Sequence, residues 1–441
     1  MEANWPMIAL LAFVTCIAAY IGRVWFKRWF NPLSIYSALW GLSLCSYELK
    51  LIQYYPISRQ AWLYIATGWI CLYSGGLTAL LLVRPTKPAK TIPTATNLDL
   101  IKTTIIIISV VGGVAVARQM QILTREFGGV ITAVLSSGND IYRGKLEGDL
   151  SFFPYVGACL YAGCTLSGVY TAIRGKLTGL ALLPVLLLAL NNALSMIRAG
   201  VIMAAFLFLA GFLQSPRDRP FKIKKWQAIL GVGVAVAVLL AGFILVSATR
   251  GLGGDFPGTT PAMESIAEYI PFLPSVYSNL SAPPVALSLY LSTPEGQNTS
   301  PWGEYTFAPV LRVLSRTGLV SERPRYEEDY YTPVPTNTST YLKNLDSDFG
   351  FPGVILFPYA LGFVMTLLTS GVAQTFRVTY IVVLANLYLI IMGSFAVNLM
   401  VLGDWYISLI VGITVGIVID RRSHFIESMT SPMGNPRAEM P

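Results

Sequence analysis

Long apolar segments alternate with short polar connections over most of the chain. A helix of about 20 predominantly apolar residues crosses the hydrocarbon core of a bilayer. Eleven segments match that length closely enough to be predicted as spans: 6–22, 33–53, 61–83, 102–121, 152–173, 177–193, 197–214, 226–248, 351–371, 378–399 and 403–419. The pattern therefore predicts an all-α polytopic membrane protein, with transmembrane helices in 1–248 and 351–419.

Composition agrees with this prediction and indicates which classes of binding partner to expect. The 441 residues are 54% hydrophobic and 12% charged, against roughly 25% charged in soluble domains. The net charge is +8, but the sequence lacks the basic block with interleaved aromatic residues that tracks a nucleic-acid backbone. Membrane lipids are thus expected partners, and nucleic acid is not.

Cysteine and histidine usage limits the possible chemistry. The five cysteines lie in apolar segments and are odd in number, so a disulfide framework is not expected. The single histidine, His424, lies in the polar tail 420–441, which excludes the usual zinc ligand pattern. The sequence also lacks a glycine-rich phosphate loop with its lysine. We therefore expect neither a metal nor a cofactor.

Basic residues are concentrated in alternate connections, and this bias predicts the orientation. Cytoplasmic loops carry an excess of Lys and Arg, which places the N-terminus outside and the tail 420–441 inside. Eighteen of the 31 basic residues fall on this predicted inner side: Arg23, Lys27, Arg28, Arg84, Lys87, Lys90, Lys102, Arg174, Lys176, Arg217, Arg219, Lys222, Lys224, Lys225, Arg377, Arg421, Arg422 and Arg437.

Two outer segments are too long to be simple connections. The first, 122–151, has charges around a short apolar run and is predicted to be an amphipathic helix at the interface. The second, 249–350, is a large outer loop with six basic and eleven acidic residues. Helical apolar spacing appears at 262–270 and 308–320, whereas no long run alternates as a strand would. Short helices over the outer mouth of the bundle are therefore expected.

Arginines near the outer face are candidates for binding a pyrophosphate. An ionisable residue in a membrane helix is costly and often functional, and arginine binds phosphate oxygens in a bidentate manner. Contact with lipid headgroups is the alternative. Arg312 and Arg316 are four residues apart, so a shared anion would relieve their repulsion, although salt bridges with Glu304 or Glu322 would also do so. The full set is Arg143, Arg198, Arg250, Arg312 and Arg316.

Carboxylates directly before the span at 351 are candidates for a general base. Asp348 and Asp346 would meet the substrate at the membrane surface, where a base can take a proton from a sugar hydroxyl. We favour Asp348 from the sequence, with Asp346 and Glu304 as further candidates. Helix capping is the structural alternative for either aspartate. Asn337 and Tyr341 belong to the same polar, tyrosine-rich region, whose rings suit the faces of sugars.

These features together resemble the O-antigen polymerase (Wzy) family of oligosaccharide repeat unit polymerases. The shared elements are Asn31-Pro-Leu-Ser at the start of the second span and an Asn/Ser-rich setting around Arg198. A large late outer loop then ends in Asp348-Phe-Gly350-x-x-Gly353. The likeness covers most of the chain, and the Asp-Phe-Gly region is its most specific part.

The resemblance implies a GT-C-like glycosyltransferase of the bacterial inner membrane that uses undecaprenyl-pyrophosphate-linked glycans. The growing chain would be the donor and one lipid-linked unit the acceptor, giving O-antigen, capsular polysaccharide or exopolysaccharide. A chain-length regulator and a flippase would be partners. The related ligases use an outer-loop histidine, whereas His424 lies in the predicted inner tail. A ligase-like transferase and a flippase remain the alternatives, although flippases typically show internal repeats and short loops.

Overall fold

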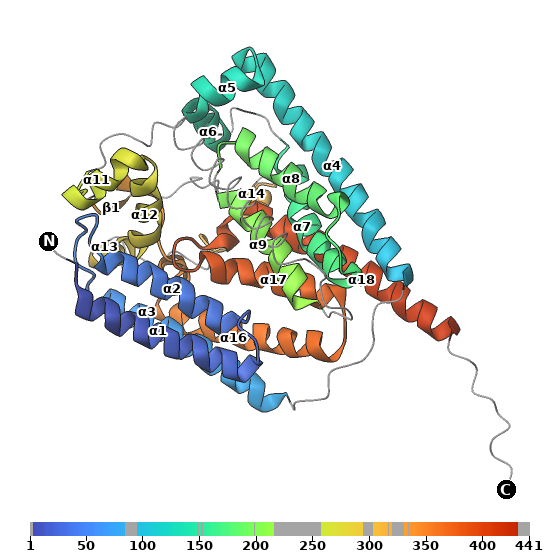
Figure 1. Cartoon of the computed structure of the whole chain (residues 1–441), viewed down its shortest axis with the longest axis horizontal. Helices are drawn as coiled ribbons and strands as arrows, with labels where there is room; N and C mark the ends of the chain where they lie inside the picture. Colours follow the sequence, from blue (N-terminus) through green and yellow to red (C-terminus); the bar gives the residue numbers. More distant parts are fainter. Residues whose placement is uncertain are drawn as a thin grey trace, which may run out of the picture.

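A computed structural model describes the fold of most of the chain. The described residues are 3–83, 95–147, 150, 153–197, 199–215, 257–293, 303–315, 317–319, 330–333 and 335–430. Within them the chain is predominantly helical (Figure 1). The predicted span 226–248 lies outside the described residues.

Six of the described helices are long and apolar enough to cross a membrane. They are α1 (Trp5–Phe26), α3 (Arg59–Leu82), α4 (Ala95–Phe127), α7 (Pro154–Arg174), α16 (Phe351–Gln374) and α18 (Gly403–Thr430). Shorter apolar helices correspond to three further predicted spans: α8 (Gly179–Leu194), α9 (Ala199–Gln214) and α17 (Val378–Gly393). The predicted span 33–53 contains the 17-residue α2 (Pro32–Glu48). The prediction of an all-α membrane protein is thus confirmed.

The membrane helices form two groups that meet at α17 (Figure 1). One group contains α1, α2, α3 and α16, and the other contains α4, α7, α8, α9 and α18. Close packing of α3 on α16 depends on glycine: a Cβ added to Gly75 would lie 2.0 Å from the carbonyl oxygen of Tyr359. Small residues allow such close backbone approach in membranes, where burial of apolar surface does not drive association.

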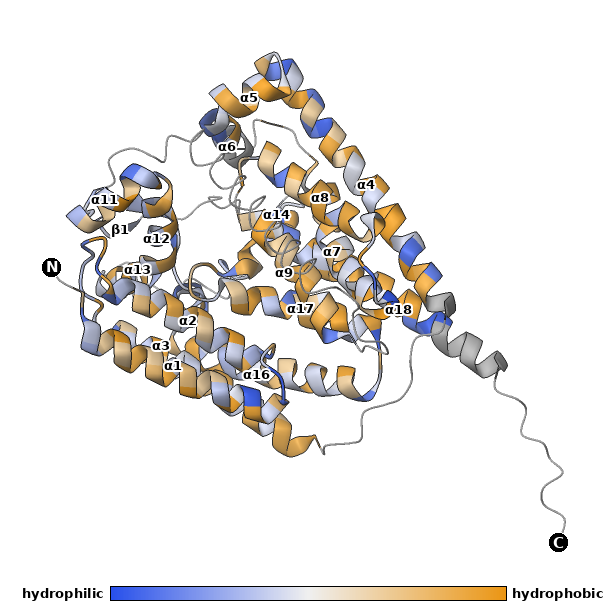
Figure 2. Ribbon diagram, viewed as in Figure 1, coloured by the Kyte–Doolittle hydropathy of each residue, from blue (hydrophilic) through white to orange (hydrophobic). Residues whose placement is uncertain are grey.

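The long helices are mainly apolar (Figure 2), and many of their large apolar side chains are exposed. Large side chains such as Phe13 on α1 and Val110 on α4 are exposed. Contiguous apolar surface of this extent is typical of a lipid-facing belt. The surface pattern therefore agrees with the six long apolar helices.

The large outer loop forms short helices and one small hairpin. Its helices are α11 (Pro261–Tyr269), α12 (Leu273–Ser281), α13 (Pro283–Ser292), α14 (Ala308–Ser315) and α15 (Tyr341–Phe349). Helices were predicted at 262–270 and 308–320, and α11 and α14 confirm both, although α14 ends at Ser315. The hairpin of β1 (Tyr330–Tyr331) and β2 (Pro335–Thr336) was not predicted, because two-residue strands are too short to show alternation.

Hydrogen bonds attach α12 and α13 to the ends of α2 and α3. Ser43 of α2 donates through its hydroxyl to the carbonyl oxygen of Leu280 at 2.7 Å. The backbone N–H of Ser58, which precedes α3, donates to the Ser288 hydroxyl at 2.8 Å. Helices α11, α12 and α13 lie at the end of the bundle at which α1 begins (Figure 1).

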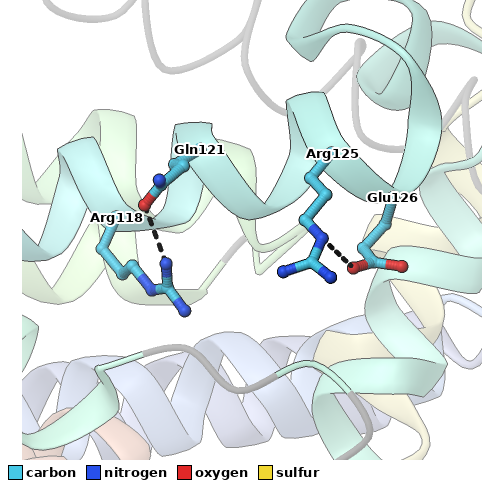
Figure 3. Close-up of polar contacts among 4 residues, drawn as sticks. All are labelled: Arg118, Gln121, Arg125 and Glu126. Carbon is cyan, nitrogen blue, oxygen red and sulfur yellow. Dashed lines mark hydrogen bonds and ion pairs between the residues drawn. The ribbon is translucent and has the colours of Figure 1, made fainter.

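The first outer segment differs from the single helix predicted over 122–151. Helix α4 continues to Phe127, and two short helices follow, α5 (Val130–Ser136) and α6 (Gly138–Glu147). Near the end of α4, Arg118 donates to Gln121 at 2.7 Å and Arg125 lies 3.7 Å from Glu126 (Figure 3). The Arg125 side chain is 84% exposed, and such surface ion pairs stabilise a fold little.

Candidate functional site

Helix α15 is short, polar and buried along nearly its whole length. Every residue from Tyr341 to Asp348 is buried, including Lys343, Asp346 and Asp348. Gly350, at φ 65°, ends the helix, and α16 begins at the next residue. Burial of a charged group costs free energy unless partners compensate it. The partners of these side chains therefore define what α15 does.

Two tyrosines from separate helices hold the carboxylate of Asp346. The hydroxyl of Tyr64 on α3 donates to Oδ1 at 2.9 Å, and that of Tyr290 on α13 donates to Oδ2 at 3.2 Å. Ser347 donates to the same Tyr290 oxygen at 2.9 Å. Burial raises the pKa of the Asp346 carboxyl, and the two tyrosine hydrogen bonds partly oppose that change. A carboxylate with a raised pKa is a stronger base near neutral pH.

Asp348 has a different set of partners, all of them backbone amides. Its Oδ1 accepts from the N–H of Tyr305 at 2.8 Å, and its Oδ2 accepts from the N–H of Thr306 at 2.6 Å. The carbonyl oxygen of Thr306 in turn accepts from the Tyr406 hydroxyl of α18 at 3.1 Å. Asp348 thus connects α15 to the turn before α14. This is a structural role of the capping kind, the alternative to catalysis that the sequence left open. This geometry makes Asp346 the better candidate for a general base.

The contacts of Asp348 predict a loss of stability on substitution. Asp348→Asn presents an amide NH₂ to one of the two backbone N–H donors, so one donor loses its acceptor. Leaving a buried donor without a partner costs about 1–3 kcal/mol. We expect a lower thermal unfolding midpoint in detergent, with elongation per folded molecule retained. Wild-type stability combined with abolished elongation would instead place Asp348 in the chemistry.

Lys343 is a buried residue of the site that the sequence did not single out. Its ammonium lies 5.7 Å from the ring centroid of Tyr290, 5.2 Å from that of Tyr305 and 5.3 Å from that of Tyr330. Cations at such distances are attracted to aromatic faces. The sequence offered one signal: Lys343 precedes Asp346 by three positions in a helical segment, so both lie on one face.

The remaining predicted residues are distributed unevenly around α15. The Tyr341 hydroxyl lies 3.1 Å from that of Tyr36, and both rings are buried. Glu304 is partly buried in the turn that Asp348 holds, while Asn337 is exposed shortly before α15. Of the predicted arginines, Arg312 is partly buried on α14 and Arg143 is exposed on α6, whereas Arg198, Arg250 and Arg316 lie outside the described residues.

The described part of the chain is thus an all-α membrane protein in which α15, a short polar helix of the outer loop, is buried. Within the described ranges, no three His, Cys, Asp or Glu side chains are grouped so as to hold a metal ion. Comparison with protein-family models, curated proteins and solved structures yields no match to this chain.

Proposed function

We propose that the chain is a metal-independent polymerase that joins undecaprenyl-pyrophosphate-linked oligosaccharide repeat units. The observation that carries the proposal is the buried Asp346 carboxylate, held by Tyr64 and Tyr290 directly before a membrane helix. A carboxylate at this position can meet a hydroxyl of a lipid-linked glycan at the bilayer surface. The tyrosines of the neighbouring elements provide rings that suit sugar faces.

In this proposal the chain spans the bacterial inner membrane eleven times in a GT-C-like arrangement. The N-terminus and the loop helices face the periplasm, and the tail 420–441 faces the cytoplasm. The alternate distribution of basic residues supports this orientation. The loop helices and the start of α1 lie at the same end of the bundle, as the orientation requires (Figure 1).

The proposed reaction moves one proton and exchanges one bond. Asp346 takes the proton of an acceptor sugar hydroxyl, and the oxygen attacks the anomeric carbon of the donor glycan. The bond from that carbon to the pyrophosphate oxygen breaks, and the lipid pyrophosphate leaves with the electron pair. Outer-face arginines stabilise the negative charge on the leaving group. The energy comes from the pyrophosphate linkage, so the reaction needs no nucleotide.

Lys343 provides a positive charge near Tyr290 and Asp346 in this proposal. Its ammonium lies 5.7 Å from the centroid of the Tyr290 ring, and the hydroxyl of the same tyrosine donates to the Asp346 carboxylate. We propose that Lys343 orients Tyr290 and through it the base, rather than touching the substrate.

The tyrosine contacts predict how activity depends on pH. The base works only when deprotonated, so elongation falls as pH drops through the pKa of Asp346. Tyr64→Phe removes a hydrogen bond that lowers this pKa, so the acidic limb of the pH–rate profile moves to higher pH. Tyr73→Phe on the same helix is the matched control, because its hydroxyl contacts Ser37 instead. An unchanged limb in Tyr64→Phe would remove Asp346 from the role of base.

A flippase is the main alternative, and a ligase-like transferase is the second. A flippase moves a lipid-linked unit across the bilayer without lengthening it, whereas a polymerase produces glycans of several units. We expect vesicles containing the purified protein to convert a fluorescent lipid-linked unit into longer products. Translocation of the unit without longer products would favour the flippase, and transfer to a non-glycan lipid acceptor alone would favour the ligase.

A further inference from the structure

The turn between α1 and α2 is held in a fixed conformation by its own side chains. The Asn31 side chain accepts from the N–H of Ser34 at 2.9 Å and donates to the carbonyl oxygen of Arg28 at 2.7 Å. Phe30 packs against Phe206 of α9 and Tyr388 of α17, with ring centroids 6.1 Å and 5.0 Å apart. The Asn-Pro-Leu-Ser element therefore builds a turn that is anchored in the helix bundle.

This turn places the guanidinium of Arg28 beside the bundle without a counter-charge among the described residues. Arg28 is partly buried, and its buried Nε has no hydrogen-bond partner among the described residues. Its ion-pair partners are likewise absent from the described part of the chain. Burial lowers the pKa of Arg28, with Tyr388 the only group opposing that change, but arginine stays charged in proteins. A partly desolvated cation needs an anion to offset its cost.

A second buried polar group lies next to Tyr388. Gln214 of α9 is 2% exposed, and its Nε2 donates to the Tyr388 hydroxyl at 3.0 Å. Its Oε1 has no hydrogen-bond partner in the described structure. Buried polar atoms nearly always have partners, so this atom indicates that the polar region around Tyr388 is incomplete. Because Oε1 accepts hydrogen bonds, a ligand group that donates one, such as a headgroup hydroxyl, would complete it.

The surface around the turn has the features of a membrane interface. Trp29 is 59% exposed and Val24 is 52% exposed, and Arg23 lies 5.8 Å from the Trp29 ring. Tryptophan beside basic residues is typical of the headgroup level of a bilayer. The exposed apolar side of α1 continues from this level, so an acyl chain can lie along it. A ligand with both an anionic group and an apolar chain fits these features.

We infer that Arg28 binds the phosphate of an anionic phospholipid, whose headgroup lies at the turn between α1 and α2 and whose acyl chains lie along α1. The guanidinium offers a planar pair of donors that matches phosphate oxygens. A free phosphate would satisfy the charge but would leave the apolar surface beside it uncovered. The lipid would join α1 and α2 to the second helix group through α9 and α17.

The test measures lipid binding to the purified full chain in neutral detergent. Phosphatidylglycerol is added in steps, and phosphatidylcholine and inorganic phosphate are added in separate experiments. Native mass spectrometry counts the bound lipid, and the thermal unfolding midpoint is measured on the same samples. We expect phosphatidylglycerol to remain bound and to raise the midpoint of the wild type. Arg28→Gln should bind it about ten- to a hundred-fold more weakly. Arg125→Gln removes an exposed arginine of α4 that lies beside Glu126, and it should bind nearly as the wild type does.

Several outcomes would overturn the inference. Equal phosphatidylglycerol affinity in Arg28→Gln and the wild type would remove Arg28 from the site, and an equal effect of phosphatidylcholine would show that the charge is irrelevant. An equal midpoint shift with inorganic phosphate would assign the site to a free anion. Should Arg28→Gln fail to fold, Arg28→Lys keeps the charge but loses the paired donors, and unchanged affinity in that variant would contradict the geometry. Binding is measured without elongation, so this result is independent of the proposed polymerase activity.

Discussion

Asp346→Asn is expected to lower the rate of glycan elongation about a hundred- to ten-thousand-fold, the usual contribution of a general base. Asparagine preserves the size of the side chain and one acceptor oxygen for Tyr64 or Tyr290, but it cannot take a proton. The loss should therefore appear in the rate constant for elongation at saturating substrate. Single-turnover elongation with a defined lipid-linked unit measures it directly.

The stability of this variant separates catalysis from structure. Folding raises the pKa of Asp346, so stabilisation from this group is present below its unfolded pKa and is lost as pH rises through its folded pKa. At neutral pH the ionised carboxylate therefore opposes folding. Asp346→Asn removes that charge, and a tyrosine hydroxyl, unlike a backbone N–H, can turn to accept from the new amide, so the thermal midpoint should be equal to or above that of the wild type.

Asp348→Asn is the matched control, because the two aspartates lie on the same helix with different partners. We expect Asp346→Asn to fold well and elongate poorly, and Asp348→Asn to show the opposite behaviour. Full elongation by Asp346→Asn would exclude the proposed base. A variant that loses stability and activity together would mean that Asp346 only supports the fold.

Arg198→Ala and Arg250→Ala are each expected to slow elongation strongly while the protein stays in the membrane. Both residues are outside the described part of the chain, so this prediction rests on their sequence positions at the outer ends of predicted spans. Removing one donor to a developing oxyanion costs roughly 2.7–4 kcal/mol of barrier, which is about a hundred- to a thousand-fold in rate. Elongation rates of purified variants at equal protein concentration measure the effect.

Two substitutions control for charge and geometry. Arg→Lys at either position should restore little activity, because an ammonium does not reproduce the paired donors of a guanidinium. Arg125→Ala removes an arginine whose partner is the exposed Glu126, and elongation should be unchanged. Wild-type rates in both Arg198→Ala and Arg250→Ala would show that these arginines contact only lipid headgroups.

The membrane-spanning part of the fold follows from local sequence, which is why it was predictable. A span needs only a run of apolar residues of sufficient length, and α3 and α16 satisfy this condition along their whole length. Helices α11 and α14 were also predictable, because the helical spacing of their apolar residues can be read from a short stretch of sequence. The division of 122–151 into α5 and α6 was missed, although Ser136-Ser137-Gly138 at the break is a local turn signal.

The site was less predictable, because its partners come from distant parts of the sequence. Asp346 and Tyr64 are 282 positions apart, and Asp346 and Tyr290 are 56 apart. Local sequence placed both Asp346 and Asp348 shortly before α16 and led us to favour Asp348 as the base. The backbone amides of Tyr305 and Thr306 distinguish the two aspartates, and backbone donors carry no residue-type signal.

Elongation by the purified protein tests the polymerase proposal most directly. The protein, reconstituted in lipid, is incubated with a defined undecaprenyl-pyrophosphate-linked repeat unit in excess chelator and without nucleotide sugar, and the products are separated by length. We predict a ladder of glycans of increasing unit number, lost in Asp346→Asn. A wild-type reaction that yields no product longer than the starting unit, or that lengthens it only with added metal or nucleotide sugar, would contradict the account.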